Sequence, residues 1–327
     1  MSATSTAAPL YLSENDVSRL LTMPDAIDTI HAAFVAQACG EASNHPRERF
    51  FVPAGVLHHM AAAWPGRSGG GVMGTKTYTS FASGTRFWVQ LFSAQTGDLL
   101  ALIEADRLGQ IRTGAATGVA ARHLARTDAT TAAVLGTGGQ ARTQAQALVV
   151  ACPTLQRIHA FGRDEERRRA FCQELTDALG IPVLPAGSVE EAVRDAQIIV
   201  CVTTAREPIL KGGEHLAPGT FVAAVGANRL TAREIDEEVV GRANVIVVDD
   251  AAQVHAEAAE LVFAHERRKF AWEKACSLAS VVAGHAPGRT SDDEIVLFKS
   301  LGVALEDVAV AALVYDQARA ANAGRSL

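Results

Sequence analysis

The residues whose types and spacing most directly suggest chemistry form a glycine-rich run. It comprises Gly136-Thr137-Gly138-Gly139-Gln140-Ala141 and follows a short apolar stretch, Ala132-Ala133-Val134-Leu135. In such a run the first glycine permits a tight turn, the second lets the backbone approach a pyrophosphate, and the alanine lets a helix pack on the preceding strand. The N-terminus of that helix also offers unpaired N–H groups. The run therefore predicts a dinucleotide-binding turn, with a glycine-rich turn that binds nothing as the alternative.

The end of the next expected strand, residues 157–161, bears on the choice between NAD and NADP. An acidic side chain there binds the ribose 2′-hydroxyl of NAD, whereas an arginine accommodates the 2′-phosphate of NADP. Gly162 stands where the acid is expected, Arg163 and Arg167 favour a phosphate, and the nearby Asp164 favours the hydroxyl. Alternatively, both arginines only solvate the start of a helix. The sequence thus leaves the cofactor as NAD(P)H.

The elements that must position this turn belong to an expected α/β domain. Apolar strands are predicted at 130–135, 157–161, 198–203, 221–225 and 245–248, and helices at 164–179 and 188–196. Ser188 and Glu191 fit a capping box at the start of the last helix. Strands that alternate with amphipathic helices predict a doubly wound, parallel Rossmann sheet covered on both faces.

The first third of the chain predicts a different, mostly antiparallel α+β unit. A helical region at 13–40, capped by Ser13 and with a second start near Pro24, precedes strands at 47–52, 56–64, 72–80, 87–93 and 99–103. A helix of small residues at 108–126 would bridge the two domains, and 292–323 is predicted to be one helix that returns to the first. The expected domains are therefore 1–112, completed by 303–327, as a substrate-binding and dimerisation domain, and 113–302 as the NAD(P)-binding domain.

Composition excludes several classes of function. The chain has 327 residues, of which 48% are hydrophobic and 20% charged, and its net charge is −6. This composition is typical of a globular protein, and no basic cluster or long apolar run favours nucleic acid or a membrane as a partner. Five widely spaced cysteines indicate neither a disulfide framework nor a metal site. The N-terminal residues 1–9 lack the pattern of a secretory signal, so a cytoplasmic location is expected.

Together with its flanking segments, the glycine-rich run makes the sequence resemble the ornithine cyclodeaminase and mu-crystallin family along nearly the whole chain. The matching segments are 46–49, 73–76, 96–104, 105–115, 136–141, 225–228 and 297–300 with Gly302; Arg112-Thr113-Gly114-Ala115 and the GxGGQA run are the most specific. The resemblance implies a homodimer whose first-domain sheet and C-terminal helix form the dimer interface and the substrate floor. It also implies that one lysine and two arginines hold the substrate carboxylate beside the nicotinamide.

The matching positions give the expected site residues. Substrate would be held by Lys76, Arg112 and either Arg49, which is favoured, or Arg47, and a guanidinium fork suits a planar carboxylate. The alternatives are a solvated arginine at 47 or 49, an exposed edge lysine at 76, and an Arg112 that pairs with cofactor phosphate. The expected cofactor-binding residues are Arg112, Thr113, Gly136, Thr137, Gly138, Gly139, Gln140, Ala141, Gly162, Arg163, Asp164, Thr203, Thr204, Val225, Gly226, Ala227 and Lys299.

Asn228 departs from the pattern of the cyclodeaminases, in which the matching position resembles an aspartate that handles protons. An asparagine cannot take up a proton near neutral pH. Reduction of an imine needs no such base, because a protonated C=N accepts hydride directly. The alternative is that Asn228 only caps a helix starting at Thr231. With Lys76 and Arg112, Asn228 completes the expected catalytic set.

The sequence therefore predicts an NAD(P)H-dependent oxidoreductase that reduces a small 2-imino acid to the L-amino acid. Candidate substrates are 1-pyrroline-2-carboxylate, iminosuccinate and the imine of pyruvate; Arg47, Arg86 and His59 are the candidates to meet an acidic distal end. Lys76 or a water would manage the proton. The alternatives are a cyclodeaminase that releases ammonia from ornithine and a nucleotide-dependent binding protein of the mu-crystallin type.

Overall fold

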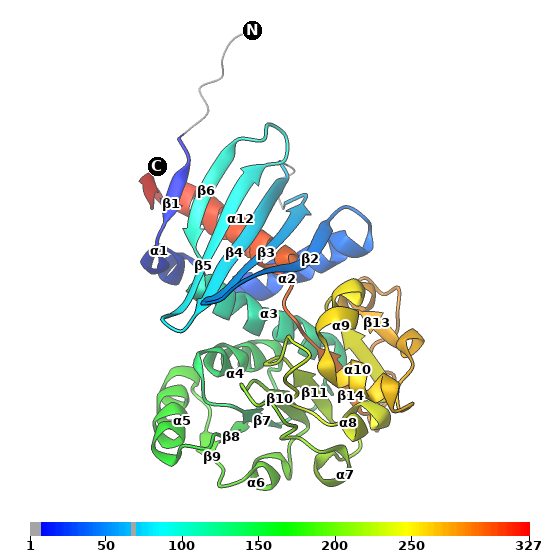
Figure 1. Cartoon of the computed structure of the whole chain (residues 1–327). Coiled ribbons are helices and arrows are strands. Elements are labelled where there is room, and N and C mark those ends of the chain that lie inside the picture. The colour runs from blue at the N-terminus through cyan, green and yellow to red at the C-terminus, as the bar shows by residue number, and fades with distance from the viewer. Residues whose placement is uncertain (1–7, 67–69) are drawn as a thin grey trace. The chain divides into compact units, whose positions relative to one another are not determined.

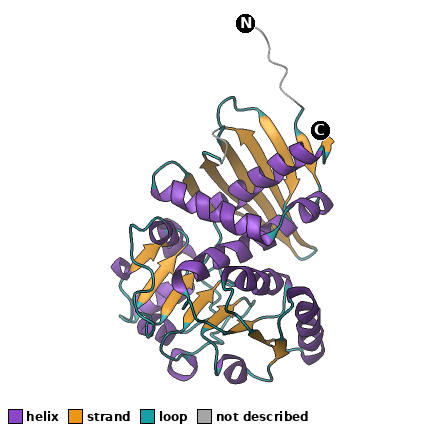
Figure 2. Cartoon of the chain, turned by 180° about the vertical axis from the view of Figure 1, so that it is seen from behind, coloured by secondary structure: helices purple, strands orange, loops and turns teal. Residues whose placement is uncertain are grey.

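The computed structural model describes residues 8–66 and 70–327. The expectation of a cytoplasmic location rested on residues 1–9. Of these, residues 1–7 lie outside the described residues. The chain divides into two compact units: Met1–Arg112 with Val303–Leu327, and Thr113–Gly302. Each unit has its own β-sheet (Figures 1 and 2).

The first unit is built on a sheet whose order, among the described residues, is β15-β1-β6-β5-β4-β3-β2. The pairs from β2 to β6 are antiparallel, whereas β1 lies parallel to β6. The sequence predicted this antiparallel core. The strands are β1 (Leu10–Leu12), β2 (Ser43–Val52), β3 (Gly55–Trp64), β4 (Val72–Phe81), β5 (Gly84–Ser93), β6 (Leu99–Glu104) and β15 (Arg325–Ser326).

One face of this sheet is covered by α12 (Ala304–Ala321), beside which α2 (Met23–Ala38) packs (Figure 2). Burial alternates along β3, where Met60 and Ala62 are buried and their neighbours Ala61 and Ala63 are only half-buried. Successive side chains of a strand point to opposite faces, so the sheet has one helix-covered face and one open face. Only residues on the same face of this sheet can therefore meet.

The expected helical region at 13–40 is two helices, α1 (Glu14–Leu20) and α2. Ser13 caps α1 in a reciprocal capping box with Asp16, and Thr22 caps α2 just before Pro24. The small-residue helix is α3 (Asp106–Leu124), and the division between the two units falls within it, after Arg112.

The second unit carries a parallel sheet of order β13-β12-β14-β11-β10-β7-β8-β9 among the described residues. The chain runs outward from β7 through β8 to β9 and then returns to β10 on the other side of β7. The order therefore reverses at β7, the position where dinucleotides bind in such sheets. The strands are β7 (Thr131–Leu135), β8 (Arg157–Phe161), β9 (Val183–Pro185), β10 (Ile198–Cys201), β11 (Phe221–Ala224), β12 (Val245–Val248), β13 (Ala275–Ser277) and β14 (Val296–Lys299).

Helices accompany the strands of this sheet, as the sequence predicted for an α/β unit (Figure 1). They are α4 (Gly139–Ala151), α5 (Glu165–Leu179), α6 (Val189–Val193), α7 (Gly212–His215), α8 (Glu237–Arg242), α9 (Ala251–Glu257), α10 (Ala259–Glu266) and α11 (Leu278–Val282), with a 3₁₀ turn at Trp272–Lys274. No helix among the described residues combines the length and the apolar character that a membrane crossing requires.

The prediction of one helix over 292–323 was wrong. Residues 296–299 form β14, a fully buried strand between β12 and β11, and the helix begins only at Ala304. A short apolar run such as Val296-Leu297-Phe298 fits a buried strand and a buried helix equally well, since neither needs a polar face. Gly302, with a φ of 74°, separates the two elements.

The expected capping box at Ser188 forms only in part. The Ser188 hydroxyl accepts the N–H of Glu191, but the Glu191 carboxylate accepts the N–H of Gly187 instead of that of Ser188. The helix that follows is also shorter than predicted, Val189–Val193.

Candidate active site

The glycine turn of the second unit follows β7 directly. Gly136 has a φ of 128°, and a Cβ there would meet the carbonyl oxygen of Val202, so only glycine fits. Gly138 differs, because a Cβ there would meet nothing within 4 Å. Ala141 is fully buried where α4 packs onto the sheet. The open space at Gly138 is the room that a pyrophosphate needs.

Helix α4 begins at Gly139 without a side-chain cap, because its N-cap residue is Gly138. Its first-turn N–H groups therefore point outward at the positive end of the helix dipole, with Thr137 and Gln140 half-buried beside them. An uncapped helix start next to an open glycine fits the diphosphate of a dinucleotide. Within the second unit, Gly114 of α3 touches α4 so closely that a Cβ would meet the backbone of Thr143, and Gln144 donates to the carbonyl of Thr113.

Glu234, which the sequence analysis missed, ties together the loops after β10 and β11. This buried carboxylate accepts hydrogen bonds from the backbone N–H and hydroxyl of Thr203 at 2.5 and 2.9 Å and from the N–H of Gly226 at 2.6 Å. Burial raises its pKa, while Lys299 and these donors oppose the rise. Thr203 and Gly226, both expected at the cofactor, are thus held in place by one side chain. Thr204 is exposed beside Thr203.

Lys299 is placed otherwise than the sequence predicted. Its ammonium group is fully buried, donating to the carbonyl of Ala227 at 2.6 Å and to Glu260 at 3.2 Å. An ammonium group enclosed by oxygens of its own unit is not available to a cofactor, so its contribution is to fix the 225–228 loop. A buried lysine needs such partners, because an unpaired buried charge is strongly unfavourable.

Asn228 lies half-buried in this loop, four residues beyond the last residue of β11. The idea that it caps a helix starting at Thr231 was wrong. The next helix is α8, which begins at Glu237 and is capped by Asp236. Val225 and Ala227, the other loop residues expected near the cofactor, are half-buried and buried respectively.

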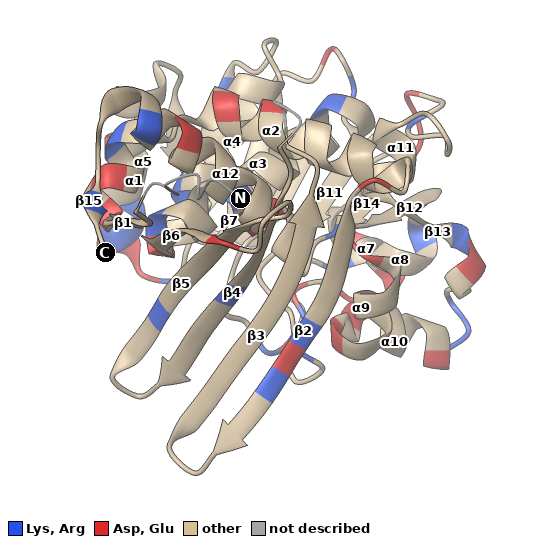
Figure 3. Cartoon of the chain, turned by 90° about the horizontal axis from the view of Figure 1, so that it is seen from above, with Lys and Arg blue, Asp and Glu red and all other residues tan. Residues whose placement is uncertain are grey.

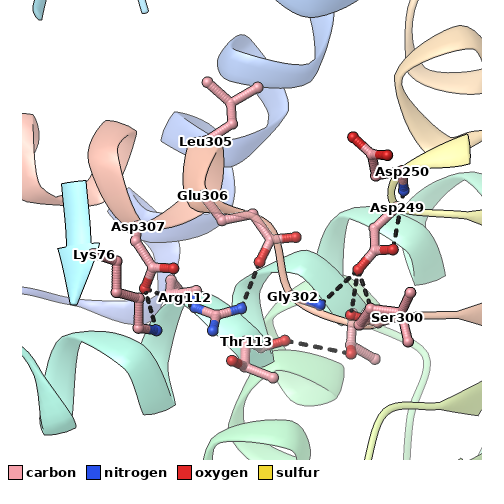
Figure 4. A network of polar contacts seen from close by, with 12 residues as sticks. Lys76, Arg112, Thr113, Asp249, Asp250, Ser300, Gly302, Leu305, Glu306 and Asp307 are labelled. Atoms are coloured by element: carbon pink, nitrogen blue, oxygen red, sulfur yellow. Dashed lines mark hydrogen bonds and ion pairs between the residues drawn. The ribbon is translucent and has the colours of Figure 1, made fainter. Parts of the chain in front are cut away.

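In the first unit, the expected substrate cations Lys76 and Arg112 meet at a single carboxylate, Asp307 (Figure 4). The Asp307 Oδ1 atom accepts from Lys76 Nζ at 2.7 Å and from Arg112 Nε at 3.0 Å. The neighbouring Glu306 accepts from Arg112 Nη1 at 2.7 Å. We call these four residues, from β4, α3 and the first turn of α12, the clamp.

The clamp is almost free of solvent, and this shapes its protonation. Burial and the charge of Arg112 lower the pKa of Lys76 to about 8, although Asp307 opposes the shift. Burial works against the charge of Arg112, but Asp307 and Glu306 together raise its pKa above the usual value. Arg112 is therefore a permanent cation, whereas Lys76 exchanges its proton near neutral pH.

Arg47 and Arg49 both belong to β2, and their spacing predicted that they share one face of the strand. Arg47 is buried and its charge helps to lower the pKa of Lys76. Arg49 is half-buried and pairs in register with His58, whose pKa burial and then the charges of Arg49 and Arg47 lower to about 4. His58 is thus neutral at physiological pH and stacks on Tyr78, with ring centroids 4.1 Å apart. Both arginines remain candidates for the substrate carboxylate.

The expected distal candidates His59 and Arg86 lie on the wrong face of the sheet. His59 pairs with Thr77, and Arg86 pairs with Thr79. Thr77 and Thr79 lie one and three positions beyond Lys76 on β4, so their side chains point to the opposite face of the sheet. His59 and Arg86 therefore point to the open face, away from the clamp. Figure 3 shows how sparse charge is on the central strands compared with β2. Of the three proposed distal cations, only Arg47 stays on the side of the clamp.

One group of possible metal ligands occurs among the described residues: Glu190, Glu214 and His215, whose ligand atoms lie within 4.8 Å of one another. However, His215 Nδ1 accepts the backbone N–H of Lys211 at 2.9 Å, so the neutral ring carries its hydrogen on Nε2. That nitrogen faces Glu190 at 3.5 Å as a donor. A ring nitrogen that carries a hydrogen does not bind a metal, so the arrangement suits a polar contact between the imidazole and Glu190 instead.

The fold and these sites define the class to which the chain belongs. The model of the ornithine cyclodeaminase/mu-crystallin family matches residues 8–322. The chain is a member of that family, as the sequence resemblance predicted.

Three relatives illustrate its range. A Delta(1)-pyrroline-2-carboxylate reductase of Bacillus cereus is 36% identical over 231 residues, 70% of each chain. The solved structure of the Thermococcus litoralis Delta(1)-pyrroline-2-carboxylate reductase with NADH and L-proline has a TM-score of 0.90 at 30% identity, covering 97% of this chain and 100% of the other. An archaeal alanine dehydrogenase dimer with bound NAD has the same TM-score and identity, covering 98% and 99%.

Proposed function

We propose that this protein is an NAD(P)H-dependent reductase that converts a small 2-imino acid into the L-amino acid. The observation that carries the proposal is the clamp, a buried lysine and arginine oriented by one carboxylate. The second unit supports it with an open glycine turn beside an uncapped helix start. Relatives with high structural similarity reduce pyrroline-2-carboxylate or oxidise alanine, and both reactions interconvert a C=N and a CH–NH group next to a carboxylate.

The clamp and the β2 arginines carry the charge needed to bind a carboxylate. Lys76, Arg112, Arg47 and Arg49 bring more positive charge than Asp307 and Glu306 neutralise. Asp307 uses one of the three N–H donors of Lys76, and the two carboxylates use two of the five donors of Arg112. The clamp is buried, and charge-assisted hydrogen bonds to a carboxylate are strongest in such a site of low dielectric.

Lys76 also suits the proton balance of the reaction. Reduction places a hydride on the C2 carbon and leaves a proton on the nitrogen, and NAD(P)H supplies the hydride when it is bound. With a pKa of about 8, Lys76 is mostly protonated at neutral pH and returns its proton readily. It can therefore keep the imine nitrogen protonated. Asn228 takes no part as a base, which favours imine reduction over cyclodeamination.

The experiment is a panel of imines assayed by the loss of NADH or NADPH absorbance. It compares 1-pyrroline-2-carboxylate with iminosuccinate and with pyruvate plus ammonia. We expect 1-pyrroline-2-carboxylate to be reduced to L-proline. An absence of turnover with every imine, combined with proline formation from ornithine, would replace this proposal with cyclodeamination. Tight ligand binding without cofactor oxidation would favour a binding protein.

We further propose that the protein is a cytoplasmic homodimer joined through the open face of the first-unit sheet. Large apolar side chains are exposed along it and its hairpins, including Phe50 (53%), Phe51 (75%) and Met73 (40%). A hollow of about 620 Å³ lies over β2, β3 and β4 on this face. Exposed apolar patches of this kind mark interfaces, and five free thiols suit a reducing compartment. Light scattering of the purified chain should give twice the mass of one chain.

A further inference from the structure

The end of β8 in the second unit leaves no room for an acidic side chain at the ribose. Gly162 follows the last strand residue, Phe161, and a Cβ at this position would lie 2.5 Å from Thr137 Oγ1 of the glycine turn. Any side chain at 162 would therefore force the Thr137 side chain of the glycine turn to move. NAD-binding sheets place an acid here to receive the ribose 2′-hydroxyl.

Asp164, the next acid along the chain, is used by the protein itself. It is the N-cap residue of α5, and its Oδ1 atom accepts the backbone N–H of Arg167 at 2.9 Å. This bond holds the carboxylate over the helix start. A capping aspartate contributes about 1 kcal/mol to helix stability, which gives its position a structural reason.

Four arginines follow the strand, and two of them have partners. Arg168 donates to the carbonyl of Gly162 at 2.7 Å, and Arg169 pairs with Glu165 at 2.6 Å. Arg163 and Arg167 are exposed, and among the described residues no hydrogen bond or ion pair engages either guanidinium group. They flank the position where the adenosine ribose of a bound dinucleotide lies.

We infer that Arg163 and Arg167 select the 2′-phosphate, so that this enzyme uses NADPH in preference to NADH. The inference deepens the dinucleotide-binding part of the proposed function. Two guanidinium groups offer the charge and the forked donors that a phosphate prefers. A ribose hydroxyl in the same place would meet two cations, and the nearest acid, Asp164, already accepts a helix N–H through its Oδ1 atom.

The test measures binding of the cofactor alone, by calorimetry on the full chain without imine. We expect NADPH to bind at least about 10-fold more tightly than NADH, since a charge-assisted hydrogen bond to phosphate is worth that much. For the same reason 2′,5′-ADP should compete better than 5′-ADP. Arg163→Ala with Arg167→Ala should weaken NADPH about 10-fold or more and change NADH affinity less than about threefold. Arg169→Ala, which removes an equal charge from the same helix, is the matched control.

Equal or tighter binding of NADH, or an equal loss of both nucleotides in the double variant, would overturn the inference. A tenfold loss of NADH affinity in Asp164→Asn would do the same, because it would place the ribose hydroxyl on Asp164. These outcomes leave imine reduction intact. If neither nucleotide binds, the proposed function fails as well, so the two failures are distinguishable.

Discussion

Replacement of Asp307 by asparagine should remove the charge that keeps Lys76 protonated. The side chain keeps its shape, but the attraction across 2.7 Å is lost, about 6 kcal/mol at an effective dielectric constant near 20. The ammonium group can still donate to the amide oxygen, and this hydrogen bond returns about 2 kcal/mol. By contrast, removing the Lys76 proton at about pH 7 costs only about 1.4 kcal/mol, given its pKa of about 8. Lys76 in the variant should therefore be neutral at physiological pH.

The pH dependence of kcat/KM for imine reduction reports this change. Because the protonated lysine is the active form, wild-type kcat/KM should fall as pH rises through about 8. In Asp307→Asn the alkaline limb should move to lower pH. Near neutral pH, kcat/KM should fall about 10- to 100-fold, the value of one charged hydrogen bond. The affinity for NADPH, measured separately, should not change.

Asp316→Asn is the control, since it removes an equal charge from an exposed position on the same helix. An alkaline limb in Asp307→Asn that coincides with the wild-type limb would refute the role assigned to Lys76. If Asp307→Asn unfolds at neutral pH, Asp307→Glu preserves the charge and should retain the wild-type limb with reduced activity.

Four further variants probe the two sites. Arg112→Ala should cost about 3 kcal/mol or more in kcat/KM while NADPH still binds, and normal kinetics would remove it from the site. Gly136→Ala should lower the free energy of unfolding by about 2 kcal/mol, measured by denaturant titration, because its φ of 128° disfavours a side chain. Gly138→Ala should fold normally and lose dinucleotide affinity. Asn228→Asp should retain imine reduction with an altered pH profile, and an identical profile would place this residue outside the site.

The glycine turn and the antiparallel sheet were predictable because local rules govern them. A glycine at a positive φ and an alternating strand leave a mark within a few residues, and β8 (Arg157–Phe161) and β12 (Val245–Val248) begin and end where the sequence predicted. β14 was missed for the converse reason. Both faces of β14 are buried, so its sequence lacks the alternation of apolar and polar residues that marks a half-exposed strand.

The partners of the predicted cations were not foreseen either, although the sequence carried a signal. Glu306 and Asp307 are the only acids in the apolar stretch 295–314, and a charge in such a stretch must be paired. Which cation pairs with it depends on tertiary contacts. Lys299 shows the same limit, since its pairing with Glu260 and Ala227 cannot be read from the chain near it. Sequence identifies such charges but not their partners.

The place of α12 in the chain affects the order in which the protein is made. Lys76 and Asp307 are 231 positions apart, and the whole of the second unit is synthesised between them. On the ribosome, the dinucleotide-binding unit can fold while β4 still lacks the helix that covers it. The substrate cations therefore receive their carboxylate only when the last helix emerges, so a truncated chain would carry the nucleotide fold without an oriented clamp.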